Sequence, residues 1–406
     1  MESGNIKTTI KNLYNKIFNS DSVKMVQNSS SLGKLKNTTE NIKKQLTKNR
    51  TYTLILVIGF ILLSLYLLFI FRRVPRYLNG LNSYKSILDL SPLDSYSFIR
   101  KKNYRLCDFY IASSYKSYLP CTNYYDYSST CAIKQALIYG ARYIDLDIYN
   151  KNFDQCTDPI VCNGKEIGNW HYTTSLSFDA CCKVISEVAF SNNVRCPTDP
   201  LFININLYVN ENIKTMNKVA ESINHYFHHK LLPLKYAHQG ISPNPKLGVN
   251  ITTLPIKDLI GKVIIVCNDH FHNSNLDELV NISPKTVGNL RELHFSDIKN
   301  SHDSEELKEY NKKHMTRVIT DEVLRDKQNF NYTIPWYFGC QFICMDYFKP
   351  DDYIKSYLKR FSKCSFILKP YKLRYHPVYI KAPKKQIPQV SFAPEKVTTP
   401  FYSITY

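Results

Sequence analysis

Hydrophobic and polar positions alternate regularly along the chain after Tyr104. Short runs of β-branched and aromatic residues are separated by stretches in which apolar residues recur every three or four positions. The runs are typical of buried strands, and the longer spacing is typical of helices that cover a sheet. The pattern therefore predicts strands and helices in alternation.

Eight segments have the composition of strands. They are Phe109–Ala112, Tyr143–Ile148, Phe202–Leu207, Val263–Cys267, Leu293–Ser296, Arg317–Thr320, Gln341–Met345 and Ser365–Leu368. Helices are predicted between them at Phe178–Phe190, at Ile213–Phe227 and at Asp351–Phe361, where an aspartate can cap the first turn. Eight strand–helix units in about 270 residues predict a (β/α)8 barrel, an α/β fold of the TIM type, whose working residues lie at the C-terminal ends of the strands.

One uninterrupted apolar run precedes the alternating part. Thr53–Phe71 contains no charged residue and is followed by Arg72 and Arg73. A helix needs about 20 apolar residues to cross a bilayer, and the polar residues before the run argue against a cleaved signal peptide. The run predicts a single transmembrane helix over residues 52–71, with a buried core helix as the alternative.

Charge suggests an orientation and a class of partner. The 406 residues carry a formal net charge of +19, and the 44% of hydrophobic residues is ample for a packed core. The basic surplus in residues 1–50 predicts a cytosolic N-terminus and a barrel that is lumenal, extracellular or virion-exposed. Anionic membrane surfaces are favoured over nucleic acid, because no basic run is interleaved with aromatic residues. A solvated, lysine-rich surface explains the charge equally well.

The twelve cysteines all follow the apolar run. In an oxidising compartment they can form disulfides, whereas in a reducing one they are small buried apolar residues. The sequence leaves both interpretations open.

Two short motifs resemble catalytic signatures from which the histidine is missing. Ser113–Leu119 resembles the run S-H-N-T-Y-L, with Tyr115 in the place of the histidine, and Pro159–Gly164 resembles P-V-x-x-H-G, with Asn163 in the place of the second one. Between them, Gln135–Asp147 resembles A-L-x-x-G-x-R-x-x-E-L-D. Together these runs resemble the X half of phosphoinositide-specific phospholipase C.

Three further runs resemble the Y half of the same family. Tyr310–Ile319 resembles N-x-x-x-L-S-R-I-Y, Asn331–Gln341 resembles N-Y-x-P-x-x-x-W-x-x-G-C-Q, and Phe366–Arg374 resembles V-L-K-P-x-x-L-R. The resemblance implies an X-like half barrel over 105–268 and a Y-like half barrel over 276–376. Around them we predict a basic flexible tail over 1–50, a juxtamembrane linker over 72–104 and a proline-containing tail over 377–406.

The resemblance implies a reaction in which the inositol 2-hydroxyl attacks phosphorus while two histidines assist and calcium neutralises the phosphate. Tyr115 and Asn163 stand at the histidine positions, and a phenol with a pKa near 10 or an amide is a poor proton carrier at neutral pH. We therefore expect hydrolysis to be lost. His171 is the exception if a shifted loop brings it to the phosphate; otherwise it is a surface residue.

The calcium ligands of the family correspond to Lys116, Asp145, Asp147 and Asn206. Calcium takes six to eight oxygen ligands, several of them charged, so an ammonium beside two carboxylates disfavours it. We hypothesise that Lys116 replaces the ion; the alternative is that its side chain points to solvent. No cofactor is expected, and calcium is needed only if activity persists.

Ser296 and Arg317 match the family's residues for a ring phosphate, to which a planar guanidinium is suited. Arg317 is equally suited to a structural ion pair. The sequence thus predicts a membrane-anchored pseudoenzyme that binds lipid headgroups or a protein partner, and not nucleic acid. An active phosphodiesterase that uses His171 and an architectural viral envelope protein are the alternatives.

Overall fold

The computed structural model describes a few residues before 45 and most residues from 90 onward. The described residues are 37, 39–41, 43–44, 53–68, 90–96, 103–120, 127–151, 157–165, 170–194, 196–238, 250–268, 270–284, 289–321, 329–376 and 393–406. The chain divides into two compact units, residues 1–79 and residues 80–406. The predicted tail over 1–50 and the linker over 72–104 lie largely outside the described residues.

Eight parallel strands of the second unit form a nearly closed barrel. In chain order they are β1 (Phe109–Ser114), β2 (Tyr143–Asn150), β7 (Leu201–Tyr208), β8 (Val263–Cys267), β9 (Val280–Ile282), β10 (Leu290–His294), β11 (Met315–Ile319) and β12 (Phe342–Met345). They are hydrogen-bonded in the order β10-β11-β12-β1-β2-β7-β8-β9, each to its neighbour in parallel. Among the described residues, no pairing joins β9 to β10 and closes the ring.

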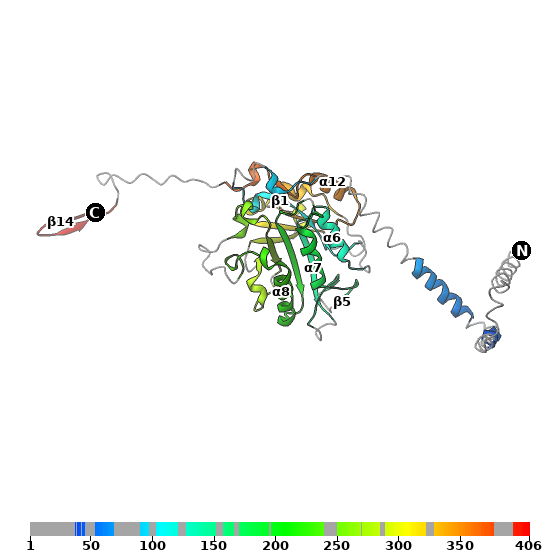
Figure 1. Cartoon of the computed structure of the whole chain (residues 1–406). Helices are drawn as coiled ribbons and strands as arrows, with labels where there is room; N and C mark the ends of the chain where they lie inside the picture. The colour runs from blue at the N-terminus through cyan, green and yellow to red at the C-terminus, as the bar shows by residue number, and fades with distance from the viewer. Residues whose placement is uncertain are drawn as a thin grey trace. The chain divides into compact units, whose positions relative to one another are not determined.

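Helices follow most of these strands. They are α6 (Thr130–Ile138), α7 (Phe178–Ala189), α8 (Ile213–Phe227), α9 (Phe295–Lys299), α10 (Ser304–Lys313), α11 (Thr333–Tyr337) and α12 (Asp352–Arg360). Figure 1 shows α6, α7 and α8 against the outside of the sheet, and α7 packs between the other two. The predicted helices thus exist, and the carboxylate of Asp351 caps α12 by accepting a hydrogen bond from the backbone N of Ile354 at 2.9 Å.

Short strands complete the unit. They are β3 (Pro159–Val161), β4 (Gly164–Lys165), β5 (Trp170–His171), β6 (Leu176–Ser177), β13 (Phe366–Leu368), β14 (Lys396–Thr398) and β15 (Ser403–Thr405). β4 and β5 pair with each other, and so do β14 and β15 within the predicted C-terminal tail. β3 extends the sheet as an antiparallel neighbour of β2.

The assignment of the eighth barrel strand differs from the prediction. Ser365–Leu368 is a strand, but β13 runs antiparallel to β1 instead of joining the parallel ring. The eighth parallel strand is β9, which pairs with β8. Its three residues, with a polar Asn281 in the middle, are too short to show the hydrophobic run of a buried strand.

Aromatic side chains fill the inside of the barrel. Tyr143, Phe202 and Phe342 are fully buried, and the ring centroid of Phe342 lies 4.4 Å from that of Tyr143 and 5.1 Å from that of Phe202. β1 and β2 are buried along their whole length, as expected for parallel strands that are covered on both faces. The core supports the C-terminal strand ends, where the polar residues gather.

The predicted transmembrane helix over 52–71 is wrong. In the part of the chain that the structure describes, no helix is long and apolar enough to cross a membrane. Residues 53–68 are helical and largely exposed. Residues 52 and 69–71 of the predicted span lie outside the described residues. This finding contradicts the predicted single-pass topology and, with it, the prediction that the barrel is lumenal, extracellular or virion-exposed.

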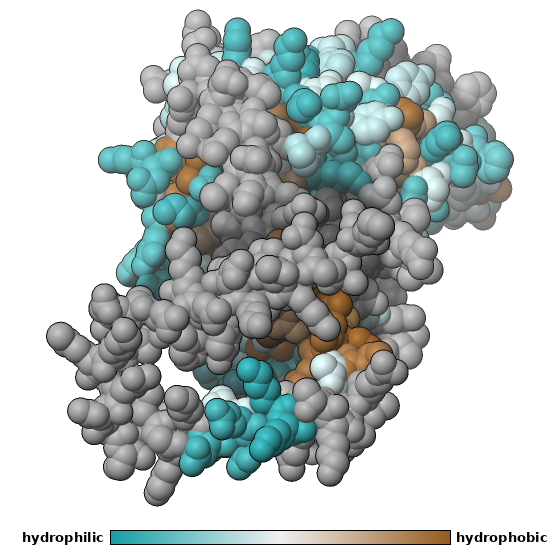
Figure 2. All heavy atoms as spheres, turned by 90° about the vertical axis from the view of Figure 1, so that its right-hand side faces the viewer, coloured by the Kyte–Doolittle hydropathy of each residue, from teal (hydrophilic) through white to brown (hydrophobic). Residues whose placement is uncertain are grey.

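Most of the described hydrophobic residues of the second unit are buried, and so are most of the described cysteines. Figure 2 shows a face whose described surface is mostly hydrophilic, with hydrophobic side chains confined to a few patches. Among the cysteines in the described residues, only Cys131 is exposed. Cys121 and Cys156 lie outside the described residues. The buried cysteines are free thiols, and burial raises the pKa of Cys340, for example, to about 12.

Candidate functional site

Polar side chains converge at the C-terminal ends of β1, β2, β7 and β11, which we call the barrel mouth. Asp145 and Asp147 of β2 lie beside Asn204 and Asn206 of β7 in the parallel register. Because side chains alternate along a strand, residues two apart face the same side, here the inside of the barrel above Tyr143. All four polar residues are buried.

Lys116 follows β1 and turns toward this cluster. Its backbone φ of 41° lies in the left-handed region, and its backbone N donates to Oδ2 of Asp145 at 3.0 Å. Its Nζ lies 3.2 Å from Oδ2 of Asp147 and donates to Oδ1 of Asn163 at 2.6 Å. The side chain is 16% exposed. The lysine thus joins both motifs that resemble catalytic signatures.

The charge of Lys116 is matched by Asp147. Burial alone would lower the pKa of Lys116, but the carboxylate of Asp147 outweighs it and holds that pKa above its ordinary value. Burial would likewise raise the pKa of Asp147, but the ammonium lowers it. Asp147 also accepts hydrogen bonds from Asn206 Nδ2 at 2.6 Å and from the Tyr118 hydroxyl at 2.9 Å. The pair is therefore fully ionised at neutral pH.

Arg317 on β11 neutralises the other carboxylate. Its guanidinium lies 2.7 Å from Oδ1 of Asp145, also pairs with Glu292, and is 4% exposed. Oδ1 of Asp145 also accepts from Asn204 Nδ2 at 2.7 Å and from Asn206 Nδ2 at 3.0 Å. Burial would lower the pKa of Arg317, but these carboxylates hold it well above its ordinary value. In this geometry Arg317 is an internal ion-pair partner.

The two positions to which the resemblance assigns histidines are both occupied by engaged side chains. Tyr115 packs against the hydrophobic core, and burial raises the pKa of its phenol. Asn163 is 3% exposed; its backbone N donates to Thr173 Oγ1 at 2.9 Å and its side-chain oxygen accepts from Lys116. Neither residue has a proton to exchange near neutral pH.

His171 and Ser296 lie at the edges of the site. His171 belongs to the β4–β5 hairpin, where it pairs with Gly164, the residue after Asn163. Its ring packs edge-on against Tyr149 with 5.3 Å between centroids, and burial lowers its pKa. Ser296 is half-buried in the first turn of α9. Its role as a phosphate ligand stays a prediction.

Three polar partners in the mouth were not predicted from the sequence. Asn204 donates a hydrogen bond to Asp145. Glu292 forms an ion pair with Arg317, and the Tyr118 hydroxyl donates a hydrogen bond to Asp147. The only signal for Asn204 is its spacing of two from Asn206 on one strand. Tyr118 matches the tyrosine of the first motif, which gave no reason to expect a hydrogen bond to a carboxylate.

The mouth does not fit the calcium ion that the resemblance implies. The two carboxylates already bind Lys116 and Arg317, and the side-chain oxygen of Asn206 accepts from Arg317 at 3.2 Å. An ammonium stands where one oxygen ligand is required, and calcium needs six to eight of them. We therefore derive no chemical step through calcium.

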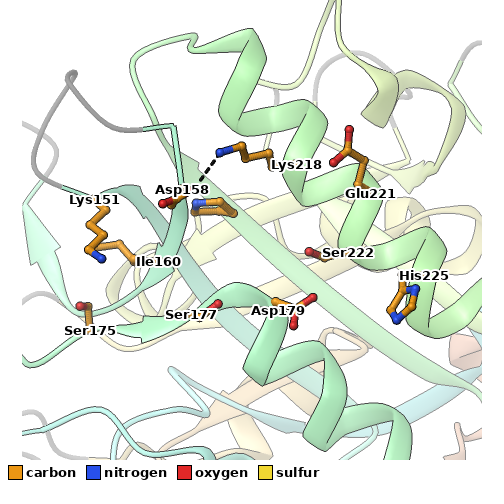
Figure 3. A pocket seen from close by; sticks show the side chains of 11 residues that line it. Lys151, Asp158, Ile160, Ser175, Ser177, Asp179, Lys218, Glu221, Ser222 and His225 are labelled. Carbon is orange, nitrogen blue, oxygen red and sulfur yellow. Dashed lines mark hydrogen bonds and ion pairs between the residues drawn. The ribbon is translucent and has the colours of Figure 1, made fainter.

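A cavity of about 600 Å³ lies outside the mouth, between β3, β6 and the helices α7 and α8. Figure 3 shows lysines and carboxylates around it, with Lys218 and Asp158 joined in an ion pair of 2.7 Å. None of the mouth residues lines it. Its mixed charges favour neither an anionic nor a cationic ligand, so we place the candidate site at the mouth.

Comparison with family models matches residues 102–267 to the X domain of phosphatidylinositol-specific phospholipase C and residues 260–372 to its Y domain. The chain belongs to this family. The matches cover the barrel from before β1 to beyond β13. The two halves of the phospholipase C barrel are therefore both present and in the order predicted from the sequence.

Two solved structures show the same fold. PLC21 of S. officinalis is 23% identical with a TM-score of 0.52, and PLC21 of L. pealei is 22% identical with the same score; each alignment covers 67% of this chain and 38% of the other. This chain thus spans well under half of those phospholipases. The phosphatidylinositol-specific phospholipase C of Listeria monocytogenes aligns over 63% of this chain and 94% of its own, at 14% identity and a TM-score of 0.41. No curated protein sequence matches.

Proposed function

We propose that this phospholipase C barrel holds a phosphorylated inositol headgroup at its mouth without calcium and without hydrolysing it. The observation that carries the proposal is the position of the Lys116 ammonium, which binds Asp147 at 3.2 Å and Asn163 at 2.6 Å. By resemblance, this is where the family holds calcium and its second histidine. A fixed cation here can meet a phosphate without any metal.

Loss of hydrolysis follows from the two replaced histidines. A positioned acid or base contributes about a hundredfold to ten-thousandfold to a rate. Burial raises the pKa of the Tyr115 phenol further from neutrality, and the Asn163 amide is engaged with Lys116. The combined loss is about ten-thousandfold or more, which leaves binding as the activity to test.

The two cations of the mouth have different roles in this proposal. Lys116 stays charged and 16% of its side chain is exposed, so a phosphate oxygen can reach its ammonium. Arg317 is 4% exposed and already bound to two carboxylates. We assign phosphate contact to Lys116 and the positioning of Asp145 to Arg317. Contact of Arg317 with a ring phosphate stays a prediction.

The proposal is tested with phosphatidylcholine vesicles that do or do not contain phosphatidylinositol bisphosphate. We expect headgroup-dependent binding that EDTA leaves unchanged, and no release of diacylglycerol with or without calcium. Lys116→Gln should weaken binding about tenfold, the effect of one charge-assisted hydrogen bond. The control Lys355→Gln removes the same charge from the exposed face of α12. Calcium-dependent binding or product release would contradict the proposal.

A second candidate function is an active phosphodiesterase that uses His171 with Asp145 and Asp147. The observation that favours it is the pairing of His171 with Gly164, which places the histidine beside Asn163 in the β4–β5 hairpin. Burial lowers the pKa of His171, so the ring is neutral at pH 7 and can accept a proton. Turnover of phosphatidylinositol that disappears in His171→Ala would establish this function. The other alternative, an architectural viral envelope protein, depended on the predicted membrane anchor and loses its support together with that anchor.

A further inference from the structure

A second cluster of titratable side chains is formed by residues outside the mouth. His238, His272 and Asp277 place one ligand atom each within 4.8 Å of one another, the only such group of three among the residues that the structure describes. Nδ1 of His238 lies 3.1 Å and Nδ1 of His272 lies 3.6 Å from the same carboxylate oxygen, Oδ1 of Asp277. We propose that these three residues bind a divalent transition-metal ion of the zinc type.

The distances suit such an ion. Zinc binds histidine nitrogen and carboxylate oxygen at about 2.0–2.2 Å. Two bonds of that length at a tetrahedral angle place their ligand atoms about 3.3 Å apart. The separations of 3.1 Å and 3.6 Å bracket this value. Imidazole with one carboxylate favours zinc, copper or nickel over calcium and magnesium, which take oxygen ligands.

The surroundings hold the three ligands in place. Oδ2 of Asp277 accepts a hydrogen bond from the backbone N of Asn273 at 3.0 Å, which leaves Oδ1 directed at the two histidines. The backbone N of His238 donates to the carbonyl of Val280 at 2.9 Å, and its ring packs against the buried Phe271. Supporting contacts of this kind orient the ligands of metal sites.

The cluster is separate from the mouth. His238 lies in the segment after α8, and His272 and Asp277 lie in the connection between β8 and β9, whereas the mouth is built on β1, β2, β7 and β11. The side chains of the three ligands are 29%, 40% and 22% exposed, so an ion can enter from solvent. A bound ion would join the segment after α8 to the connection between β8 and β9.

The test is a zinc titration of the full chain, purified without a histidine tag and stripped with EDTA. We expect one zinc ion per chain with a micromolar or tighter dissociation constant. His238→Ala and His272→Ala should each weaken it about tenfold or more. The double control His228→Ala, His229→Ala removes two exposed histidines whose ring centroids are 5.2 Å apart, the same separation as in the His238–His272 pair. It should bind zinc normally.

Two further measurements keep the outcome decisive. Thermal unfolding without metal shows whether each variant is folded; His272 has the more exposed ring, so His272→Ala remains informative if His238→Ala is unstable. Cobalt(II) should give the visible absorption of a four-coordinate ion in the native chain and not in His272→Ala. The proposal is overturned if zinc binding is absent, or if it is the same in the site variants and in the His228, His229 control.

Discussion

Lys116 combines two unfavourable features, a left-handed backbone and a largely buried ammonium. A residue other than glycine with φ of 41° costs about 1–3 kcal/mol. The cost is offset by the hydrogen bonds that this conformation permits, from the backbone N to Asp145 and from Nζ to Asn163. At the scale of single residues, the mouth is thus stabilised by pairing its charges internally.

Substitution of Lys116 should show how much the stability of the mouth depends on this pairing of charges. Lys116→Met leaves the Asp147 carboxylate buried without its cation, so we expect the free energy of unfolding to fall by about 3 kcal/mol at pH 7. Asp147→Asn should also destabilise the chain, and the double variant should lose less than the sum of the two. Urea unfolding of the four proteins measures this coupling. Strictly additive losses would mean that the ion pair contributes nothing.

The same four proteins give a pH dependence of known sign. Lys116 holds the pKa of Asp147 below its ordinary value, so the ionised carboxylate stabilises the folded state. This contribution is complete above the unfolded pKa near 4 and is lost as the pH falls through the folded pKa. The stability difference between the native chain and Asp147→Asn should therefore shrink below about pH 4.

At the scale of elements, α12 helps to position the strands that lead into the mouth. Its buried Tyr357 accepts a hydrogen bond from Ser113 N at 2.9 Å and donates to the carbonyl of Ile343 at 3.1 Å. The helix therefore holds β1 and β12 together, and Tyr115 and Lys116 directly follow β1. A substitution at the start of this helix should therefore lower the free energy of unfolding.

Asp351→Ala tests the cap of α12. The carboxylate accepts hydrogen bonds from Ile354 N at 2.9 Å and from Asn329 N at 3.3 Å, and loss of an N-cap costs about 1 kcal/mol, up to about 2. We expect the free energy of unfolding to fall by that amount in urea. Asp352→Ala, one residue later and fully exposed, is the control and should change it by less than about 0.5 kcal/mol. Equal effects of the two substitutions would show that the cap is unimportant.

The elements also show how far prediction from sequence reaches. Val263–Cys267 was predicted with its observed limits, because five consecutive apolar residues identify a buried strand. β9 was missed because three residues carry too little pattern, and the antiparallel direction of β13 has no signature in its own residues. In the mouth, Asp145 and Asp147 were predicted because they stand where the resemblance places two of the family's calcium ligands. The partners Glu292 and Tyr118 were not, because the register of β10 with β11 that sets Glu292 beside Arg317 and the turn after β1 that brings Tyr118 to Asp147 leave no pattern in the sequence.

At the scale of the whole molecule, the X and Y halves complete one another. β1 of the X half pairs with the Y-half strand β12 on one edge, and with β2 and the Y-half strand β13 on the other. Ile111 N donates to the Gln341 carbonyl at 3.0 Å, and Ala112 N donates to the Ser365 carbonyl at 2.9 Å. Arg317 adds an ion pair to Asp145 across the barrel. Neither half can satisfy its backbone or its buried charges alone.

Separation of the halves should therefore abolish folding, and recombination should restore it. Residues 80–268 alone expose the edge of β1 and leave Asp145 without Arg317, so unpaired backbone groups and a buried charge oppose the folded state. We expect this fragment to be protease-sensitive with weak near-ultraviolet circular dichroism, as should residues 269–406. Co-expressed, the two should purify together with the spectrum of the intact chain, and Arg317→Met in the second fragment should weaken their association. A fragment 80–268 that folds cooperatively by itself would show that the X half is an independent unit, because its edge strand would then need no partner from the Y half.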